Sequence, residues 1–266
     1  MHKRIIILMV LAPIASTAFA GMGDLIASFP NSGRSTHLGM AADANYLYSF
    51  HYDVATNYPM MVLRRSNGNP VRSFSLPLPY GHNIFVRGVG YEGGGYLHLN
   101  NYSNRYVAKI TTGGSFIRSW GWSGGATRYG LCIDGDKTKP DTATRIYQSY
   151  LTGIWWRSTT NGSLISSFQS PFTNYAYDLA WDYVHNLIWY ANYSVLWVFG
   201  MTPNGSIQES WALKSGVTAP YGVAYFGGRL YVSTSAGSPD EYIWVYDCSY
   251  TDVAPASLGR VKAFYR

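Results

Sequence analysis

The sequence is poor in charge and in histidine, and these shortages restrict the functions open to it. Charged residues make up 13% of the 266 residues, with 20 Lys and Arg against 14 Asp and Glu. Nucleic-acid binding needs a clustered basic stripe, and no run of Lys and Arg occurs, so we expect no nucleic-acid partner. Histidine occurs six times at scattered positions, whereas a zinc site needs three or four converging ligands. We therefore expect no metal and no cofactor.

Two metal-binding motifs are absent or incomplete. The zinc-protease pattern H-E-x-x-H does not occur. Asp134-Gly135-Asp136-Lys137-Thr138 has the spacing of the first residues of a calcium loop, but Arg145 stands where that loop needs its bidentate Glu. A solvated hairpin loop is the interpretation that we prefer for this segment.

One long apolar run lies at the N-terminus. Lys3 and Arg4 precede the apolar residues 5–11, and Ala18-Phe19-Ala20 has the small-x-small pattern of a cleavage site. We predict a signal peptide over residues 1–20, cleaved before Gly21, rather than an uncleaved membrane anchor. The protein is then secreted or periplasmic, and residues 21–266 form one domain whose formal charge falls from +6 to +4 with the loss of Lys3 and Arg4.

A repeated pattern runs through this domain: a glycine, a few alternating residues and a closing aromatic. Its copies are GDLIASF at 23–29, GNPVRSF at 68–74, GSFIRSW at 114–120, GSLISSF at 162–168, GSIQESW at 205–211 and a looser GRVKAFY at 259–265. The first five copies begin 45, 46, 48 and 43 residues apart. Short strands entered from tight turns and repeated at this period are typical of propeller blades.

A second motif follows each of these aromatic endings except the last. It reads glycine, apolar, very small, any residue, acidic, with variations, at residues 39–43, 88–92, 130–134, 178–182 and 222–226. Small residues two apart lie on one face of a strand, and they predict that another backbone comes close there. The innermost strands of a propeller converge in this way, so we assign the motif to the hub.

Two more strands, rich in Tyr and β-branched residues, follow each hub motif. The second strands are expected at 46–51, 96–101, 145–150, 187–192 and 230–234, and the third at 60–64, 106–110, 154–157, 195–199 and 243–246. The sequence thus predicts an all-β fold, a single β-propeller of five blades with four antiparallel strands each, six blades being the alternative. The fifth unit lacks an outer strand. We expect residues 23–29 to supply it rather than the segment around Val261, with Ile26 and Phe29 as the main buried contacts.

Three segments carry a family resemblance: P-Y-G-V-A at 220–224, R-L-Y-V at 229–232 and G-S-L-I-S-S-F at 162–168. In these the chain resembles the NHL and six-bladed TolB-like repeats of exported bacterial proteins. The resemblance covers nearly the whole mature chain, but only at the level of the repeat. It departs from the family in lacking Asp-x-x-Asn-x-Arg after the second strand and in having five hub motifs where six are common. It implies a propeller and transfers no catalytic residue.

The residues just before each hub motif are expected to surround one mouth of the central channel, where closed β folds bind ligands. The candidate ligand-binding residues are His37, Arg87, Arg128, Tyr129, Tyr177 and Tyr221. Arginine forks and tyrosine rings can hold an anion or a sugar. The alternative is that these side chains only cap a filled channel.

These features predict an exported, non-catalytic binding or structural module whose partner is an unknown ligand, a glycan or a protein. One alternative is a propeller enzyme acting at the channel mouth, either a hydrolase or a metal-dependent lyase similar to the streptogramin lyases. Such a lyase needs His and Glu from several blades, and only His37 has a suitable register. A second alternative is a subunit of a surface assembly. Cys132 lies at the hub and Cys248 after a third strand of another unit, so we expect no disulfide between them.

Overall fold

The structure is a computed structural model. It describes residues 22–30, 37–51, 60–76, 86–101, 106–121, 129–139, 142–150, 153–169, 176–217, 219–234 and 242–249. The predicted signal peptide at 1–20 and the last copy of the repeat at 259–265 lie outside these ranges. Within them, no helix is long and apolar enough to cross a bilayer.

Twenty strands form five four-stranded antiparallel sheets. Blade 1 contains β2 (His37–Ala42), β3 (Tyr46–His51), β4 (Met60–Arg64) and β5 (Pro70–Phe74). Blade 2 contains β6 (Val86–Gly93), β7 (Tyr96–Asn101), β8 (Tyr106–Thr111) and β9 (Phe116–Gly121). Blade 3 contains β10 (Leu131–Ile133), β11 (Arg145–Tyr150), β12 (Gly153–Ser158) and β13 (Leu164–Gln169). Blade 4 contains β14 (Ala180–Asp182), β15 (Leu187–Asn192), β16 (Trp197–Met201) and β17 (Ile207–Ala212). Blade 5 contains β18 (Pro220–Phe226), β19 (Arg229–Thr234), β20 (Tyr242–Asp247) and β1 (Leu25–Pro30).

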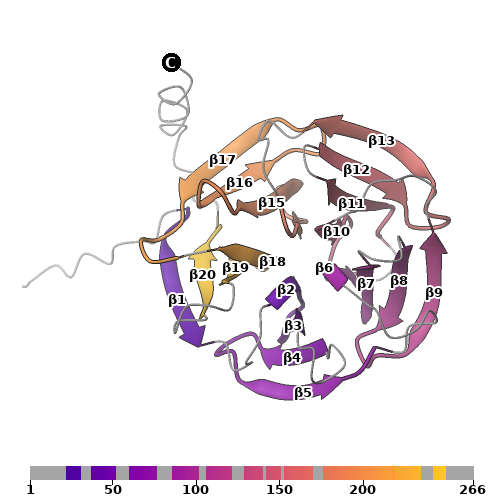
Figure 1. Cartoon of the computed structure of the whole chain (residues 1–266), viewed down its shortest axis with the longest axis horizontal. Coiled ribbons are helices and arrows are strands. Elements are labelled where there is room, and N and C mark those ends of the chain that lie inside the picture. The colour runs from indigo at the N-terminus through magenta and orange to yellow at the C-terminus, as the bar shows by residue number, and fades with distance from the viewer. Residues whose placement is uncertain are drawn as a thin grey trace, which may run out of the picture.

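The five sheets surround a common axis, with β2, β6, β10, β14 and β18 innermost (Figure 1). Neighbouring hub strands contact one another around the ring. The prediction of five blades of four antiparallel strands is therefore confirmed, and the six-bladed alternative is wrong. The hub residues are small because another backbone comes close to them, as predicted. A Cβ added to Gly88 would lie 2.4 Å from the main-chain nitrogen of Leu131.

The N-terminal strand closes the ring. β1 pairs with β20 from Leu25 opposite Tyr246 to Pro30 opposite Tyr242, and the two lie side by side in Figure 1. This confirms the expected closure by residues 23–29. Phe29 is buried as expected, but Ile26 is 40% exposed, so the expectation that Ile26 shares the burial is wrong. On this outer strand Ile26 faces solvent.

Each end of the repeated motif makes a contact that explains it. The motif glycines Gly23, Gly68, Gly114, Gly162 and Gly205 all have positive φ, between 71° and 95°. A Cβ on each would meet the closing aromatic of the preceding blade, in the order Trp211, Phe29, Phe74, Trp120 and Phe168. The turn therefore needs glycine for its backbone and for the ring above it. These five contacts run once around the propeller and link every outer strand to the next blade.

The apolar core is divided into five wedges, one between each pair of adjacent blades. Each wedge combines side chains from two sheets, such as Trp189 of blade 4 with Val232 of blade 5. The other wedges join blades 1 and 2, 5 and 1, 3 and 4, and 2 and 3. Blades are thus buried on both faces, which accounts for the many aromatic residues.

Two further predictions concern the start of one strand and the two cysteines. The third strand of blade 4 begins at Trp197 and not at Val195, because the Asn192 side chain accepts hydrogen bonds from the Ser194 and Val195 N–H groups. This turn continues to Leu196, whose φ is 55°. Cys132 and Cys248 are both buried and free, as expected for residues on separate blades.

Candidate functional site

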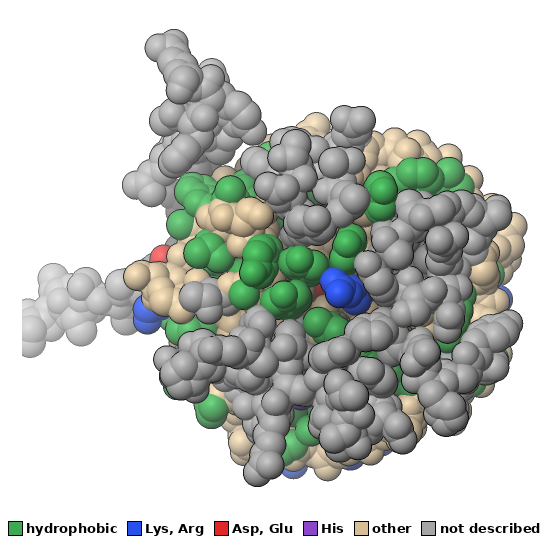
Figure 2. Space-filling view, in the orientation of Figure 1, with side chains coloured by type: hydrophobic (Ala, Val, Ile, Leu, Met, Phe, Trp, Pro, Cys, Tyr) green, Lys and Arg blue, Asp and Glu red, His purple; other side chains and the backbone are tan. Residues whose placement is uncertain are grey.

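Aromatic side chains and an arginine pack together where the hub strands begin. Figure 2 shows hydrophobic side chains around a basic patch near the centre of the propeller. Among the packed side chains, the ring of Tyr177 is central. It stacks on Tyr221, with centroids 4.7 Å apart, and meets Tyr129 edge-on at 5.6 Å. The guanidinium carbon of Arg87 lies 5.2 Å from the centroid of Tyr129 and 5.8 Å from that of Tyr177. The structure thus brings together four of the six candidate residues.

Tyr193 is a further member of this group that sequence reasoning missed. It follows β15, is 38% exposed, and its ring lies 5.5 Å from Tyr177 and 5.7 Å from Tyr221. The alternating direction of the strands could have identified it. In each blade the second strand runs back to the end at which the first strand begins, so the hairpin after the second strand lies beside the mouth. We call Arg87, Tyr129, Tyr177, Tyr193 and Tyr221 the tyrosine mouth.

The other two candidates are placed only in part or not at all. The His37 backbone pairs with His51 at the beginning of β2, in the expected register, and its side chain is not described. Arg128 lies outside the described residues. Its proposed role as a second anion ligand therefore stays a prediction.

A buried carboxylate lies directly behind the mouth. Asp178 follows Tyr177 in the chain and is fully buried. It occupies the position that glycine holds in the other four hub motifs, a departure visible in the sequence to which sequence reasoning gave no role. Burial raises the pKa of Asp178 well above its ordinary value, and backbone N–H groups that donate to the carboxylate oppose this rise.

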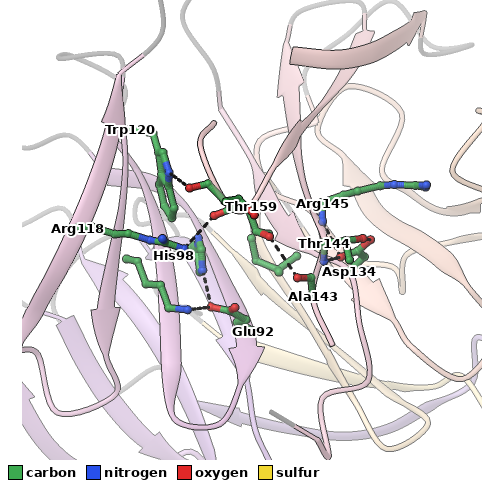
Figure 3. Close-up of polar contacts among 12 residues, drawn as sticks. Glu92, His98, Arg118, Trp120, Asp134, Ala143, Thr144, Arg145 and Thr159 are labelled. Atoms are coloured by element: carbon green, nitrogen blue, oxygen red, sulfur yellow. Dashed lines mark hydrogen bonds and ion pairs between the residues drawn. The ribbon is translucent and has the colours of Figure 1, made fainter. Parts of the chain in front are cut away.

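A buried ionic group lies within blade 2, towards the end of the propeller opposite the tyrosine mouth (Figure 3). Glu92 Oε2 lies 2.5 Å from Lys109 Nζ and 2.7 Å from His98 Nε2. Burial lowers the pKa of His98, whose ring stacks on Trp120 at 5.5 Å. We infer a neutral imidazole that donates Nε2–H to the carboxylate. All four residues belong to blade 2, so the ionic group is a set of internal contacts within one sheet.

The segment after β10 is a hairpin loop, as preferred, but its key side chains are buried rather than solvated. Asp134 Oδ1 accepts hydrogen bonds from the Thr144 and Arg145 N–H groups at 2.6 and 2.8 Å (Figure 3). Lys137 Nζ donates to the Ile133 and Asp134 carbonyl oxygens, so an ammonium lies among the oxygens that a bound cation would need. Burial lowers the pKa of Lys137 to about 8.

The ionic group predicts a pH dependence of stability. Burial alone would raise the pKa of Glu92, but His98 and Lys109 outweigh it and hold this pKa at about 2, against 4.5 for a free side chain. Because the unfolded state binds this proton more tightly, the stabilisation is complete above about pH 4.5 and is lost as the pH falls towards 2. Glu92→Gln should remove about 2–3 kcal/mol at pH 7 and flatten the unfolding free energy over that window. Urea unfolding at several pH values measures this.

The matched comparison is Lys109→Met, which keeps the carboxyl and removes the cation. This variant should shift the acid loss of stability to higher pH instead of abolishing it, because Glu92 then titrates closer to its ordinary value. Parallel pH profiles for the wild type and Glu92→Gln would contradict the assignment.

No group of three or more His, Cys, Asp or Glu side chains among the described residues is placed to hold a metal. Residues 121–125 read G-x-S-x-G, but only Gly121 is described. The hydrolase nucleophile of that pattern lies on a turn between an inner strand and a helix, whereas Gly121 ends the outermost strand of its blade. The pattern therefore assigns no nucleophile.

Comparison with known proteins agrees with the architecture. The chain has the β-propeller fold. A chain of a nidogen/laminin complex superposes with a TM-score of 0.53 over 76% of this chain and 73% of that one, at 12% identity. Virginiamycin B lyase from Staphylococcus aureus gives 0.45 over 83% and 73%, at 12% identity, and a streptogramin B lyase gives 0.45 over 84% and 73%, at 16% identity. No protein-family model and no curated protein matches the sequence. At such identities the likeness extends to the fold alone.

Proposed function

We propose that this protein is an exported, non-catalytic binding module that holds an acidic sugar or another small anionic ligand at the tyrosine mouth. The observation that carries the proposal is the convergence of one arginine and four tyrosines from blades 2, 3, 4 and 5 on one end of the channel. These residues are far apart in the sequence and meet only because the ring closes.

The chemistry of the mouth suits such a ligand. A guanidinium presents a planar fork of donors that matches a carboxylate, and its place against two aromatic rings limits the orientations it can adopt. The tyrosine rings are set at different angles: Tyr177 and Tyr221 are stacked, whereas Tyr193 stands at 86° to Tyr177. Such an arrangement offers both flat apolar faces and hydroxyl groups to a sugar.

The titratable groups near the mouth favour binding over catalysis. A general base must reach a substrate proton, directly or through one water. Asp178 is the carboxylate just behind the tyrosines, and it is fully buried with both oxygens accepting backbone hydrogen bonds. This supports a binding module over the alternative of a lyase or hydrolase at the mouth.

Export is the second part of the proposal, and it is supported by the basic, apolar and small-x-small sequence of residues 1–20. N-terminal sequencing of protein recovered outside the cytoplasm should begin at Gly21. A retained Met1 or Lys3 would contradict cleavage.

Binding can be tested with uronic-acid oligosaccharides and neutral oligosaccharides of equal length, first on an array and then by calorimetry. We expect the acidic series to bind and Arg87→Ala to weaken it about ten-fold or more, because a charge-assisted hydrogen bond is lost. Combining Arg87→Ala with Arg128→Ala tests the contribution of the second arginine.

Arg64→Ala is the matched control. Arg64 is exposed at the end of β4 that points away from the mouth, so its loss removes one positive charge without touching the site. Equal affinity of all variants at an unchanged melting temperature would remove the mouth as the binding site.

A further inference from the structure

Asp178 lies at a position of the hub motif that is glycine in the other four blades. The corresponding residues of the other blades are Gly39, Gly88, Gly130 and Gly222. A Cβ on Gly130 would lie 2.5 Å from the Cα of Asp178, so the hub backbones are closely apposed at this level. A side chain here has room only along the axis, and blade 4 alone supplies one.

The donors to this carboxylate are also equivalent in register. Each is the residue after the glycine position of its own hub motif. Asp178 Oδ2 accepts from Met40 N at 2.8 Å and from Val223 N at 3.0 Å, and Oδ1 accepts from Leu131 N at 3.4 Å. Blades 1, 3 and 5 thus each direct one equivalent N–H group to a single carboxylate.

Among the described residues no ion pair includes Asp178, and its carboxyl group is fully buried. Converging main-chain N–H groups form an anion-binding concavity without help from a cation. Met40 and Leu179 also line a channel cavity of about 20 Å³, enough for one water molecule.

We propose that the axis of this propeller is an anion-binding site built from hub N–H groups, which the Asp178 carboxylate fills from within the chain. The ligand class is a small monocarboxylate. Acetate carries the same atoms as the side chain that Asp178→Gly deletes, so it should bind in that variant on the same donors. The wild type should not bind it there, because its own side chain is in place.

The experiment compares thermal unfolding of wild type, Asp178→Gly and Asp178→Asn in sodium acetate and in sodium chloride of equal ionic strength. Asp178→Gly restores the residue of the other four blades and leaves several N–H groups without an acceptor. Its melting temperature should fall by about 10 °C. Acetate at a hundred-fold excess over its dissociation constant should return about 5–10 °C of this, with a saturable dependence on concentration.

Asp178→Asn is the control that fills the space without the charge. It should be destabilised, because its amide brings donors among donors, and acetate should not restore it. A smaller saturable effect of chloride on Asp178→Gly alone would support the site, since the same donors bind any small anion. Equal shifts in all three proteins, or no shift in Asp178→Gly, would overturn the proposal.

If Asp178→Gly does not fold in plain buffer, refolding from urea decides the question. Soluble, cooperatively melting protein in acetate but not in chloride supports the site. Failure to refold in either salt counts against it, because acetate should replace the missing carboxylate.

Discussion

A protein that begins at Asn31 should lose the cooperative unfolding transition of a protein comprising residues 21–266 and aggregate at concentrations where that longer protein stays soluble. Residues 22–30 contribute the outer strand of blade 5 and contact both of its neighbours. Gly23 lies under Trp211 of blade 4, and Phe29 lies over Gly68 of blade 1. Their removal opens the β20 edge and breaks two of the five links around the ring.

Single substitutions separate this effect from general loss of chain. Phe29 is 7% exposed, so Phe29→Ala should cost about 3–5 kcal/mol by the usual scale for buried aromatics. Ile26→Ala is the matched control on the same strand and should cost about 0.5 kcal/mol or less, because Ile26 faces solvent. Urea unfolding monitored by tryptophan fluorescence measures both. Closure by β1 would be disproved by a truncated protein that melts like the protein comprising residues 21–266.

Much of this architecture could be predicted from the sequence because every blade of a propeller has the same structural requirements. Every outer strand needs a glycine with positive φ and an aromatic to cover the next one, so the motif at Gly162–Phe168 recurs with little change. Hub strands need small residues where backbones converge. The shared position of Arg87, Tyr129, Tyr177 and Tyr221 just before each hub motif then placed them at one mouth.

The sequence could not predict the contacts that form only when the ring is closed. The hydrogen bond from Met40 N to Asp178 spans 138 residues and exists only because blades 1 and 4 face the same axis. In the sequence Asp178 is one departure from a glycine consensus, with no sign of its donors. The exposure of Ile26 also depends on which face of β1 meets the neighbouring blade, and alternation alone does not decide that.

The closeness of the hub backbones leads to the second large effect, at Gly88. A Cβ at this position would lie 2.4 Å from Leu131 N and 2.7 Å from the carbonyl carbon of Gly130. These are main-chain atoms of blade 3, which cannot rotate away as a side chain could. Gly88→Ala should therefore force blades 2 and 3 apart and cost about 3 kcal/mol or more.

Gly121→Ala is the control, since a Cβ there meets nothing within 4 Å. It should leave the unfolding free energy unchanged or raise it by about 0.5 kcal/mol, because alanine restricts the unfolded chain. Equal costs for the two substitutions in urea unfolding would show that the hub is not closely apposed. The Gly88→Ala displacement should also reach the axis, because Leu131 N is one of the donors to Asp178. In the Asp178→Gly background, the Gly88→Ala substitution should accordingly weaken the response to acetate, whereas Gly121→Ala should leave it intact.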